Sequence, residues 1–98
     1  MEFTEENWLK IGYVLGSKRK ASILRLLKEN TRTPIEISTE LNIGRGAVYA
    51  LLSEMVDIDV IACVDEERKR NKRYAATQLG VDIITSIDNR NIWGFKNG

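Results

Sequence analysis

The sequence predicts a mainly α-helical domain that carries one small β-hairpin before its last helix. Three observations predict it: helical spacing of apolar residues in successive segments, a helix start at Thr33-Pro34-Ile35-Glu36, and two short apolar segments around a basic loop. The expected order of elements is α-α-α-α-β-β-α, with a very short strand near Arg32. At 98 residues and 43% apolar content, the chain suffices for one folded domain, residues 1–98.

The first two helices are predicted from their capping residues and apolar faces. Residues 4–15 begin at Thr4, a suitable N-cap, and acids occupy the first turn, where the helix dipole stabilises them. Gly16 is expected to end this helix, and Ser17 to cap a second one that runs to about Glu29. The second helix has an apolar stripe made of Ile23, Leu24, Leu26 and Leu27.

The next two helices form a predicted helix-turn-helix. Thr33 as N-cap, Pro34 at the first helical position and Glu36 three residues after the threonine make a capping box. Asn42 is expected to end this short helix, and Ile43 to fill the turn that follows. The side chains expected to point inward are Ile35, Ile37 and Leu41 in the first of these helices, and Val48, Leu51, Leu52 and Met55 in the second, which covers residues 45–56.

A hairpin and a last helix complete the predicted domain. Residues 60–64 are apolar and β-branched, residues 73–76 are their expected partner strand, and Tyr74 is expected to anchor the hairpin on the last helix. Thr77 is expected to cap that helix, which runs to about Asn89. Its expected buried residues are Leu79, Val81 or Ile83, Ile84 and Ile87. The resulting organisation is an N-terminal helix at 4–15, the main domain at 17–89 and a tail at 90–98.

Composition excludes several classes of chemistry. The chain has no histidine and one cysteine, Cys63, which rules out zinc sites built on His or Cys clusters, an internal disulfide and a His-based catalytic triad. No nucleophile–base pair or phosphate-binding loop is visible, so neither an enzyme nor a cofactor is expected. The acidic start and the lack of a bilayer-length apolar run predict a cytoplasmic protein that does not use a membrane.

Positive charge is clustered although the net charge is only +1. The stretch 68–73, at the tip of the predicted hairpin, carries five bases with no acid among them, and a second basic group opens the second helix. Such clustering favours nucleic acid as the partner. The two groups are Arg68, Lys69, Arg70, Lys72 and Arg73 in the loop, and Lys18, Arg19 and Lys20 in the helix.

These features together resemble a known family. The matching residues are Ser17-Lys18-Arg19, Ile23 to Leu27, Thr33 to Ile37, Leu41-Asn42-Ile43, Val48-Tyr49, Leu51, Glu54-Met55, Arg73-Tyr74, Thr77 and Gly80. Their order and spacing resemble the winged helix-turn-helix domains of prokaryotic, especially archaeal, transcriptional regulators of the MarR/ArsR kind. Two positions depart from that pattern: Asp59 stands where a left-handed glycine is usual, and Gly44 replaces a Ser or Thr cap.

The resemblance implies double-stranded DNA as the partner. The helix at 45–56 would lie in the major groove, and the wing at 65–73 would follow the backbone or enter the minor groove. The candidate DNA-binding residues in the helix are Arg45, Gly46, Tyr49 and Ser53, beside the two basic groups named above. Arg45 is expected to reach guanine or phosphate, and Tyr49 phosphate or a thymine methyl. An ordinary solvated face is the alternative.

Aromatic and apolar residues near both ends predict a homodimer, formed by the first and last helices. The candidate interface residues are Trp8, Ile11, Tyr13, Ile87 and Trp93. The alternative is that the two ends pack on each other within one chain. A second function also stays open: a winged-helix protein-interaction subunit of a transcription, replication or RNA-processing assembly. The acidic residues Glu36, Glu40 and Glu54 and a recognition helix with few hydrogen-bonding groups favour it.

Overall fold

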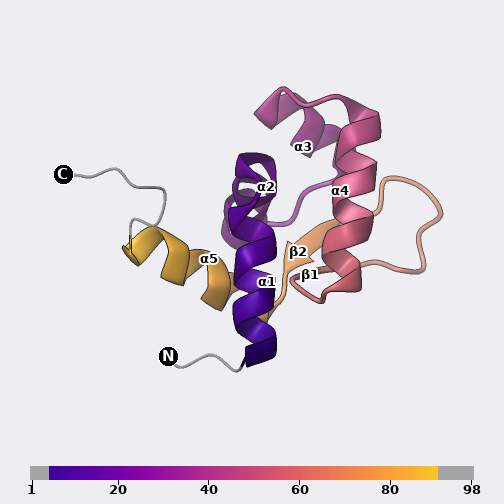
Figure 1. Ribbon diagram of the computed structural model, residues 1–98. Coiled ribbons are helices and arrows are strands. Elements are labelled where there is room, and N and C mark those ends of the chain that lie inside the picture. Colours follow the sequence, from indigo (N-terminus) through magenta and orange to yellow (C-terminus); the bar gives the residue numbers. More distant parts are fainter. Residues whose placement is uncertain (1–4, 91–98) are drawn as a thin grey trace.

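The elements of the computed structural model, which describes residues 5–90, follow the predicted order (Figure 1). They are α1 Glu5–Leu15, α2 Lys18–Glu29, α3 Pro34–Leu41, α4 Arg45–Asp57, β1 Ile61–Cys63, β2 Tyr74–Ala76 and α5 Gln78–Arg90. The predicted cap Thr4 and the tail from residue 91 lie outside the described residues. The mainly helical fold class with a two-stranded hairpin is confirmed. None of the helices within residues 5–90 is long and apolar enough to cross a membrane.

Local hydrogen bonds explain where the helices begin. The Ser17 hydroxyl accepts from the Lys20 N–H at 3.3 Å and caps α2. At α3 the capping box is complete, because the Glu36 N–H donates to Thr33 Oγ1 at 3.2 Å and the Thr33 N–H donates to Glu36 Oε1 at 2.9 Å. Asn42 ends α3 in the left-handed conformation, at φ 55°. These capping predictions, which depend only on residues close in sequence, are confirmed.

The turn from α4 into β1 holds the hairpin against α5. Asp59 adopts φ 67°, the left-handed conformation that the sequence pattern predicted at this position. The Thr77 hydroxyl donates to the Asp59 carbonyl at 2.7 Å, and the Thr77 N–H donates to the Val60 carbonyl at 3.0 Å. A Cβ at Gly80 would lie 2.0 Å from the Val60 carbonyl oxygen. Glycine therefore lets α5 approach the backbone of the hairpin.

Each helix contributes to one apolar core. Its buried residues are Ile11, Val14, Ala21, Ile23, Leu24, Leu27, Ile37, Ile43, Val48, Leu52, Met55, Val60, Ile61, Ile83, Ile84 and Ile87. One prediction is wrong: Ile35 is 40% exposed. The inner face of α3 follows Pro34, Ile37 and the half-buried Leu41, which lie three and four residues apart, so Ile35 falls off this stripe.

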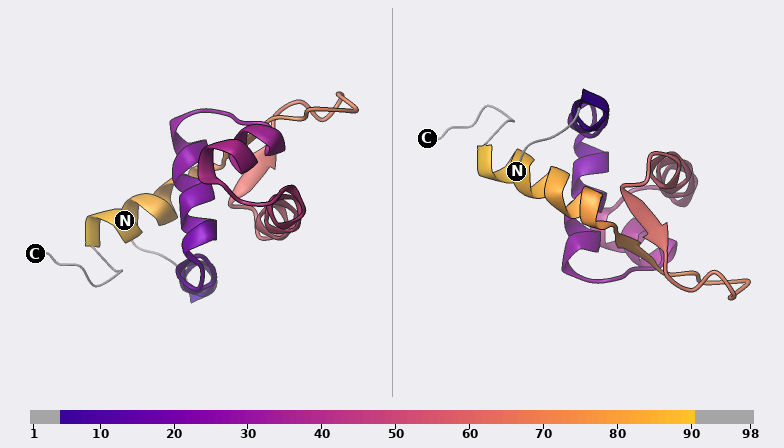
Figure 2. Two further views of the ribbon diagram at one scale, coloured as in Figure 1. Left: turned by 90° about the horizontal axis from the view of Figure 1, so that it is seen from above. Right: turned by 90° about the horizontal axis from the view of Figure 1, so that it is seen from below.

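The sheet is a hairpin extended by one isolated bridge. β1 and β2 pair antiparallel, with Ile61 opposite Ala76 and Cys63 opposite Tyr74. The Arg32 N–H donates to the Tyr74 carbonyl at 3.1 Å, and the Tyr74 N–H donates back to the Arg32 carbonyl at 2.8 Å. The short strand predicted near Arg32 is thus present as a single bridge. Beyond this sheet the loop between β1 and β2 projects past α4, away from the other helices (Figures 1 and 2).

Candidate nucleic-acid interface

Helix α4 presents the face that the sequence predicted. Val48, Leu52 and Met55 are buried. The opposite face is exposed, and it consists of Arg45, Gly46, Tyr49, Ala50 and Ser53. Gly44 caps the helix without a side-chain hydrogen bond. The first-turn N–H groups of α4 are therefore open to an anion beside Arg45, at the positive end of the helix dipole.

The wing loop carries most of its positive charge free of carboxylates. Within residues 5–90, no carboxylate oxygen lies within the 4.0 Å ion-pair distance of Lys69, Arg70 or Lys72. Arg68 differs, because its Nε lies 3.7 Å from Asp65 Oδ2 and donates to the Arg70 carbonyl at 3.3 Å. The tip of the wing thus offers three uncompensated cations, and Arg68 helps to shape the loop.

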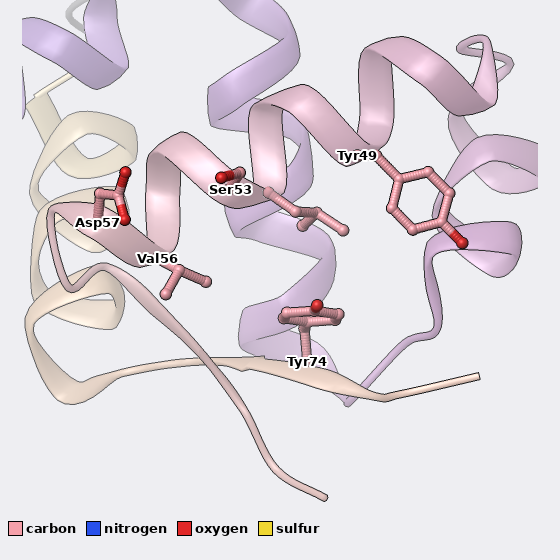
Figure 3. A pocket seen from close by; sticks show the side chains of 6 residues that line it. Tyr49, Ser53, Val56, Asp57 and Tyr74 are labelled. Carbon is pink, nitrogen blue, oxygen red and sulfur yellow. The ribbon is translucent and has the colours of Figure 1, made fainter. Parts of the chain in front are cut away.

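Two adjoining hollows lie between α4 and the wing, and Tyr49 and Tyr74 line both of them. The first, of about 240 Å³, is otherwise lined by Pro34, Lys69, Arg70, Asn71 and Lys72. The second, of about 310 Å³, is otherwise lined by Leu52, Ser53, Val56 and Asp57 (Figure 3). The first hollow is basic, and the only charged group of the second is a carboxylate. Phosphate is therefore attracted to the first hollow and repelled by the second.

Tyr74 packs against the core, as predicted, and it also lines both hollows. It is half-buried against the core, but its ring stands opposite α4, on the same side of the hairpin as Tyr49, instead of serving only to anchor the hairpin on α5 (Figure 3). Burial raises the pKa of the Tyr74 hydroxyl, and the nearby Cys63, Tyr49 and Asp65 act in the same direction. The phenol stays protonated at neutral pH and can donate a hydrogen bond into either hollow.

Arg73 differs from Lys69, Arg70 and Lys72 because its guanidinium has partners within the chain. Its Nε donates to Thr31 Oγ1 at 2.9 Å, and its Nη2 lies 3.3 Å from Glu36 Oε1. The sequence placed Arg73 among the DNA-binding residues, but the structure holds it at the foot of the wing with partners inside the chain. Those partners lie far away in the sequence, so the charge run alone did not reveal them.

The basic start of α2 lies apart from the two hollows. Lys18 and Arg19 are exposed, and neither lines either hollow. The Lys20 ammonium lies 3.5 Å from the centroid of the Tyr13 ring, a cation–π contact. The Tyr13 hydroxyl in turn donates to Glu54 Oε1. Burial and this hydrogen bond raise the pKa of Tyr13, which keeps the donor protonated. Lys20 therefore takes part in the contact between α1, α2 and α4.

The acids that favoured a protein-interaction surface all have partners within the chain. Glu36 accepts from Thr33 and pairs with Arg73, and its pKa is lowered first by the Thr33 backbone hydrogen bond and then by Arg73 and Arg32. Glu40 Oε2 lies 2.8 Å from Arg32 Nε. Glu54 accepts from the Tyr13 hydroxyl. These carboxylates hold elements together and do not form a free acidic patch.

The predicted dimer residues divide between surface and core. Trp8 is 46% exposed, and its neighbour Leu9, which the sequence prediction missed, is 73% exposed. Ile11 and Ile87 are buried in the core of the single chain, so they cannot form a surface for a second copy. Tyr13 is engaged with Lys20 and Glu54, and Trp93 lies outside the described residues. The apolar character of Ile11 and Ile87, which suggested an interface, serves the core of the single chain instead.

The candidates for thiol and metal sites are Cys63 and the acidic side chains. Cys63 is half-buried, and its Sγ lies 3.8 Å from Asp65 Oδ1. Among residues 5–90 no group of three or more His, Cys, Asp or Glu side chains is placed to hold a metal ion.

Comparison with known proteins supports the fold. No protein-family model and no curated protein matches the chain. Among solved structures the chain is similar to Lactococcus lactis ZitR, with a TM-score of 0.69 and 20% identity over 79% of this chain and 53% of that one. It is also similar to the transcriptional regulator BldR from Sulfolobus solfataricus, with a TM-score of 0.72 and 18% identity over 91% and 66%.

A third similar structure is a complex of S. aureus MepR with DNA, with a TM-score of 0.58 and 19% identity over 94% of this chain and 68% of that one. The chain therefore spans from about half to about two thirds of the length of these three proteins. Together with the element order and the projecting loop, the likeness shows that the fold is the winged helix-turn-helix.

Proposed function

We propose that the protein is a transcriptional regulator of the prokaryotic, archaeal type that binds double-stranded DNA in the cytoplasm. The observation that carries this proposal is the basic hollow between α4 and the wing, which Lys69, Arg70 and Lys72 line together with Tyr49 and Tyr74. Side chains of this kind bind phosphate oxygens, and phosphate neutralisation supplies much of the affinity for DNA.

In this arrangement one DNA strand crosses between the recognition helix and the wing. Its backbone lies over Tyr49 and the basic hollow, the first turns of α4 enter the major groove, and the wing tip continues along the backbone or into the minor groove. Arg45 is the main candidate for a base contact, because Gly46 and Ala50 carry no hydrogen-bonding side chain. Readout therefore depends largely on DNA shape. Lys18 and Arg19 add phosphate contacts if the duplex bends toward α2.

The comparisons support this proposal without supplying the target. BldR is named a transcriptional regulator, and MepR was solved together with DNA. The pairing of Glu36, Glu40 and Glu54 inside the chain also weakens the protein-interaction alternative. We further propose a homodimer whose contact is built on α1 around Trp8 and Leu9, which are exposed apolar side chains of adjacent residues. Two copies would present two recognition helices to a two-fold symmetric site.

The test is binding of the full chain to a random-sequence duplex at two salt concentrations. Lys72→Ala is expected to weaken binding and to reduce the slope of log K against log salt by about 0.9, the loss of one phosphate contact. Lys28→Ala is the matched control, because Lys28 is an exposed lysine near the end of α2 that lines neither hollow. Absence of binding by the wild-type chain at low salt would reject DNA in favour of the protein-interaction alternative.

A further inference from the structure

The foot of the wing is held by both the side chain and the backbone of Arg73. Its guanidinium donates to Thr31 twice, from Nε to Oγ1 at 2.9 Å and from Nη2 to the carbonyl at 3.0 Å. The Arg73 N–H donates to Asp65 Oδ1 at 2.8 Å, and its carbonyl accepts from the Val64 N–H at 2.9 Å. The last loop residue before β2 is therefore tied both to the hairpin and to the segment that leads into α3.

The other end of this contact is the carboxylate that starts α3. Nη2 of Arg73 lies 3.3 Å from Glu36 Oε1, the same oxygen that accepts from the Thr33 N–H in the capping box. The Arg73 side chain is 39% exposed and Glu36 45% exposed, so the pair lies at the surface next to the basic hollow. Pro34, two residues before Glu36, lines that hollow together with Lys72, which precedes Arg73.

We propose that Arg73 is a positioning residue, which together with Glu36 and Thr31 forms a wing latch that fixes the wing against α3. Where DNA is concerned the inference rests on the function proposed above. The latch holds Lys69, Arg70 and Lys72 beside Tyr49, with which they line the basic hollow. Arg73 acts through this placement and does not itself neutralise a phosphate, because its guanidinium already has a carboxylate and two oxygens of Thr31 as partners.

Glu36→Gln distinguishes a positioning role of Arg73 from a phosphate contact, because the two roles predict opposite changes in DNA affinity. Glutamine can still accept from the Thr33 N–H, so α3 keeps its capping box, but the charge that holds Arg73 is lost. If Arg73 were a phosphate contact, removing Glu36 would free it and strengthen DNA binding. The latch predicts the opposite, a loss on the order of 3- to 10-fold, because the wing bases are no longer held in place.

Glu40→Gln is the matched control. Glu40 lies one turn further along the same helix and also pairs with an arginine, Arg32 at 2.8 Å, but it does not touch the wing. It loses the same charge at a similar place. We expect DNA affinity to be unchanged or slightly increased, since one negative charge near the phosphates has been removed. A loss in Glu40→Gln equal to that in Glu36→Gln would overturn the latch in favour of a general effect on α3.

Arg73→Lys tests geometry separately from charge. A lysine keeps the positive charge but cannot bridge Thr31 and Glu36 as the planar guanidinium does. We expect it to weaken binding nearly as much as Arg73→Ala, and neither variant to change the salt slope. A slope that falls by about 0.9 in Arg73→Ala and is restored in Arg73→Lys would identify Arg73 as a phosphate contact and overturn the proposal.

Amide hydrogen exchange of the full chain without DNA tests the latch independently of DNA binding. Glu36→Gln and Arg73→Ala are expected to accelerate exchange at Val64, Tyr74 and Arg32, whose N–H groups bond within the sheet, and to leave α5 unchanged. Unchanged exchange at these amides would overturn the latch. If the two variants exchange faster but the wild-type chain does not bind DNA, the latch is supported and the proposed function is rejected.

Discussion

The two hollows beside the Tyr49–Tyr74 pair share a wall but differ in charge. The hollow toward the wing tip is lined by Lys69, Arg70 and Lys72, whereas the hollow toward the end of α4 has Asp57 as its only charged residue. Helix α4 is thus divided along its length. The difference indicates that DNA meets the first half of the recognition helix together with the wing, and that the second half lies at the edge of the interface or beyond it.

The largest expected effect comes from removing the charge of the basic hollow. Replacing Lys69, Arg70 and Lys72 together by alanine should weaken duplex binding by roughly 100-fold or more near 0.1 M salt and reduce the salt slope by about 2 to 3. Fluorescence anisotropy with a labelled duplex measures both quantities. Because these side chains are exposed or half-exposed, the unfolding temperature should be unchanged. Undiminished affinity would show that DNA does not use this hollow.

A smaller effect is expected at the wall that the two hollows share. Tyr74→Phe removes one hydroxyl and leaves the ring in place, so binding should weaken by about 0.5–1.5 kcal/mol, the usual contribution of one hydrogen bond. The raised pKa of Tyr74 means that the hydroxyl stays a donor through neutral and mildly alkaline pH. The Tyr74 hydroxyl itself should therefore contribute no titration to DNA binding between pH 6 and 9. A titration there would point to another group.

Gly46→Ala tests how closely DNA approaches the first half of α4. No atom lies within 4 Å of a Cβ added at Gly46, so alanine should stabilise the folded chain by roughly 0.5–1 kcal/mol through its higher helix propensity. The same methyl group would stand between the backbone and a phosphate and should weaken DNA binding several-fold. Chemical denaturation and duplex titration measure the two effects. A rise in stability with unchanged affinity would move the contact away from Gly46.

The smallest change in DNA affinity is expected at the second hollow, which Asp57 lines. Asp57→Asn removes the carboxylate and should strengthen DNA binding by about 2-fold at low salt, since the charge is exposed and well screened. Asp82→Asn on α5 is the control, because Asp82 lines neither hollow. A loss of affinity in Asp57→Asn alone would mean that this hollow takes part in binding, and that α4 is not divided as we describe.

Most of the fold could be predicted because the signals are local. The capping box at Thr33, the left-handed residue at Asp59 and the apolar spacing of α4 each depend on residues within a few positions of one another. Ile35 was misplaced because α3 is one short helix with apolar residues on two faces, and only packing against the core selects Pro34 and Ile37. Ile11 and Ile87 were assigned to a dimer interface for a related reason: an apolar residue near a chain end can serve the core or an interface, and only the fold shows that these two are buried.

The sequence predicted that the candidate site contains a basic wing, but not which of the wing bases pair with other residues of the chain. In the sequence, the bases from Arg68 to Arg73 form one uniform group. In the structure, Arg68 pairs with Asp65, and Arg73 contacts Thr31 and Glu36. The three bases between them have no ion pairs among residues 5–90. Gly80 belonged to the matching pattern without an evident reason, and the reason is the Val60 carbonyl beside it. Thr31 and Glu36 lie far from Arg73 in the sequence, and Val60 lies far from Gly80, so periodicity and capping do not indicate these contacts.

The sequence by itself determined the helices, the hairpin and the presence of a basic wing, because hydrogen bonds and apolar spacing over one or two turns suffice to specify them. Only the tertiary structure decided which charges are free. Electrostatic partners are chosen by distance in space, and folding brings Glu36 to Arg73, Glu40 to Arg32 and Glu54 to Tyr13. Among residues 5–90, Lys69, Arg70 and Lys72 beside Tyr49 are a cluster of bases that this pairing leaves without carboxylate partners, and that cluster is where we place DNA.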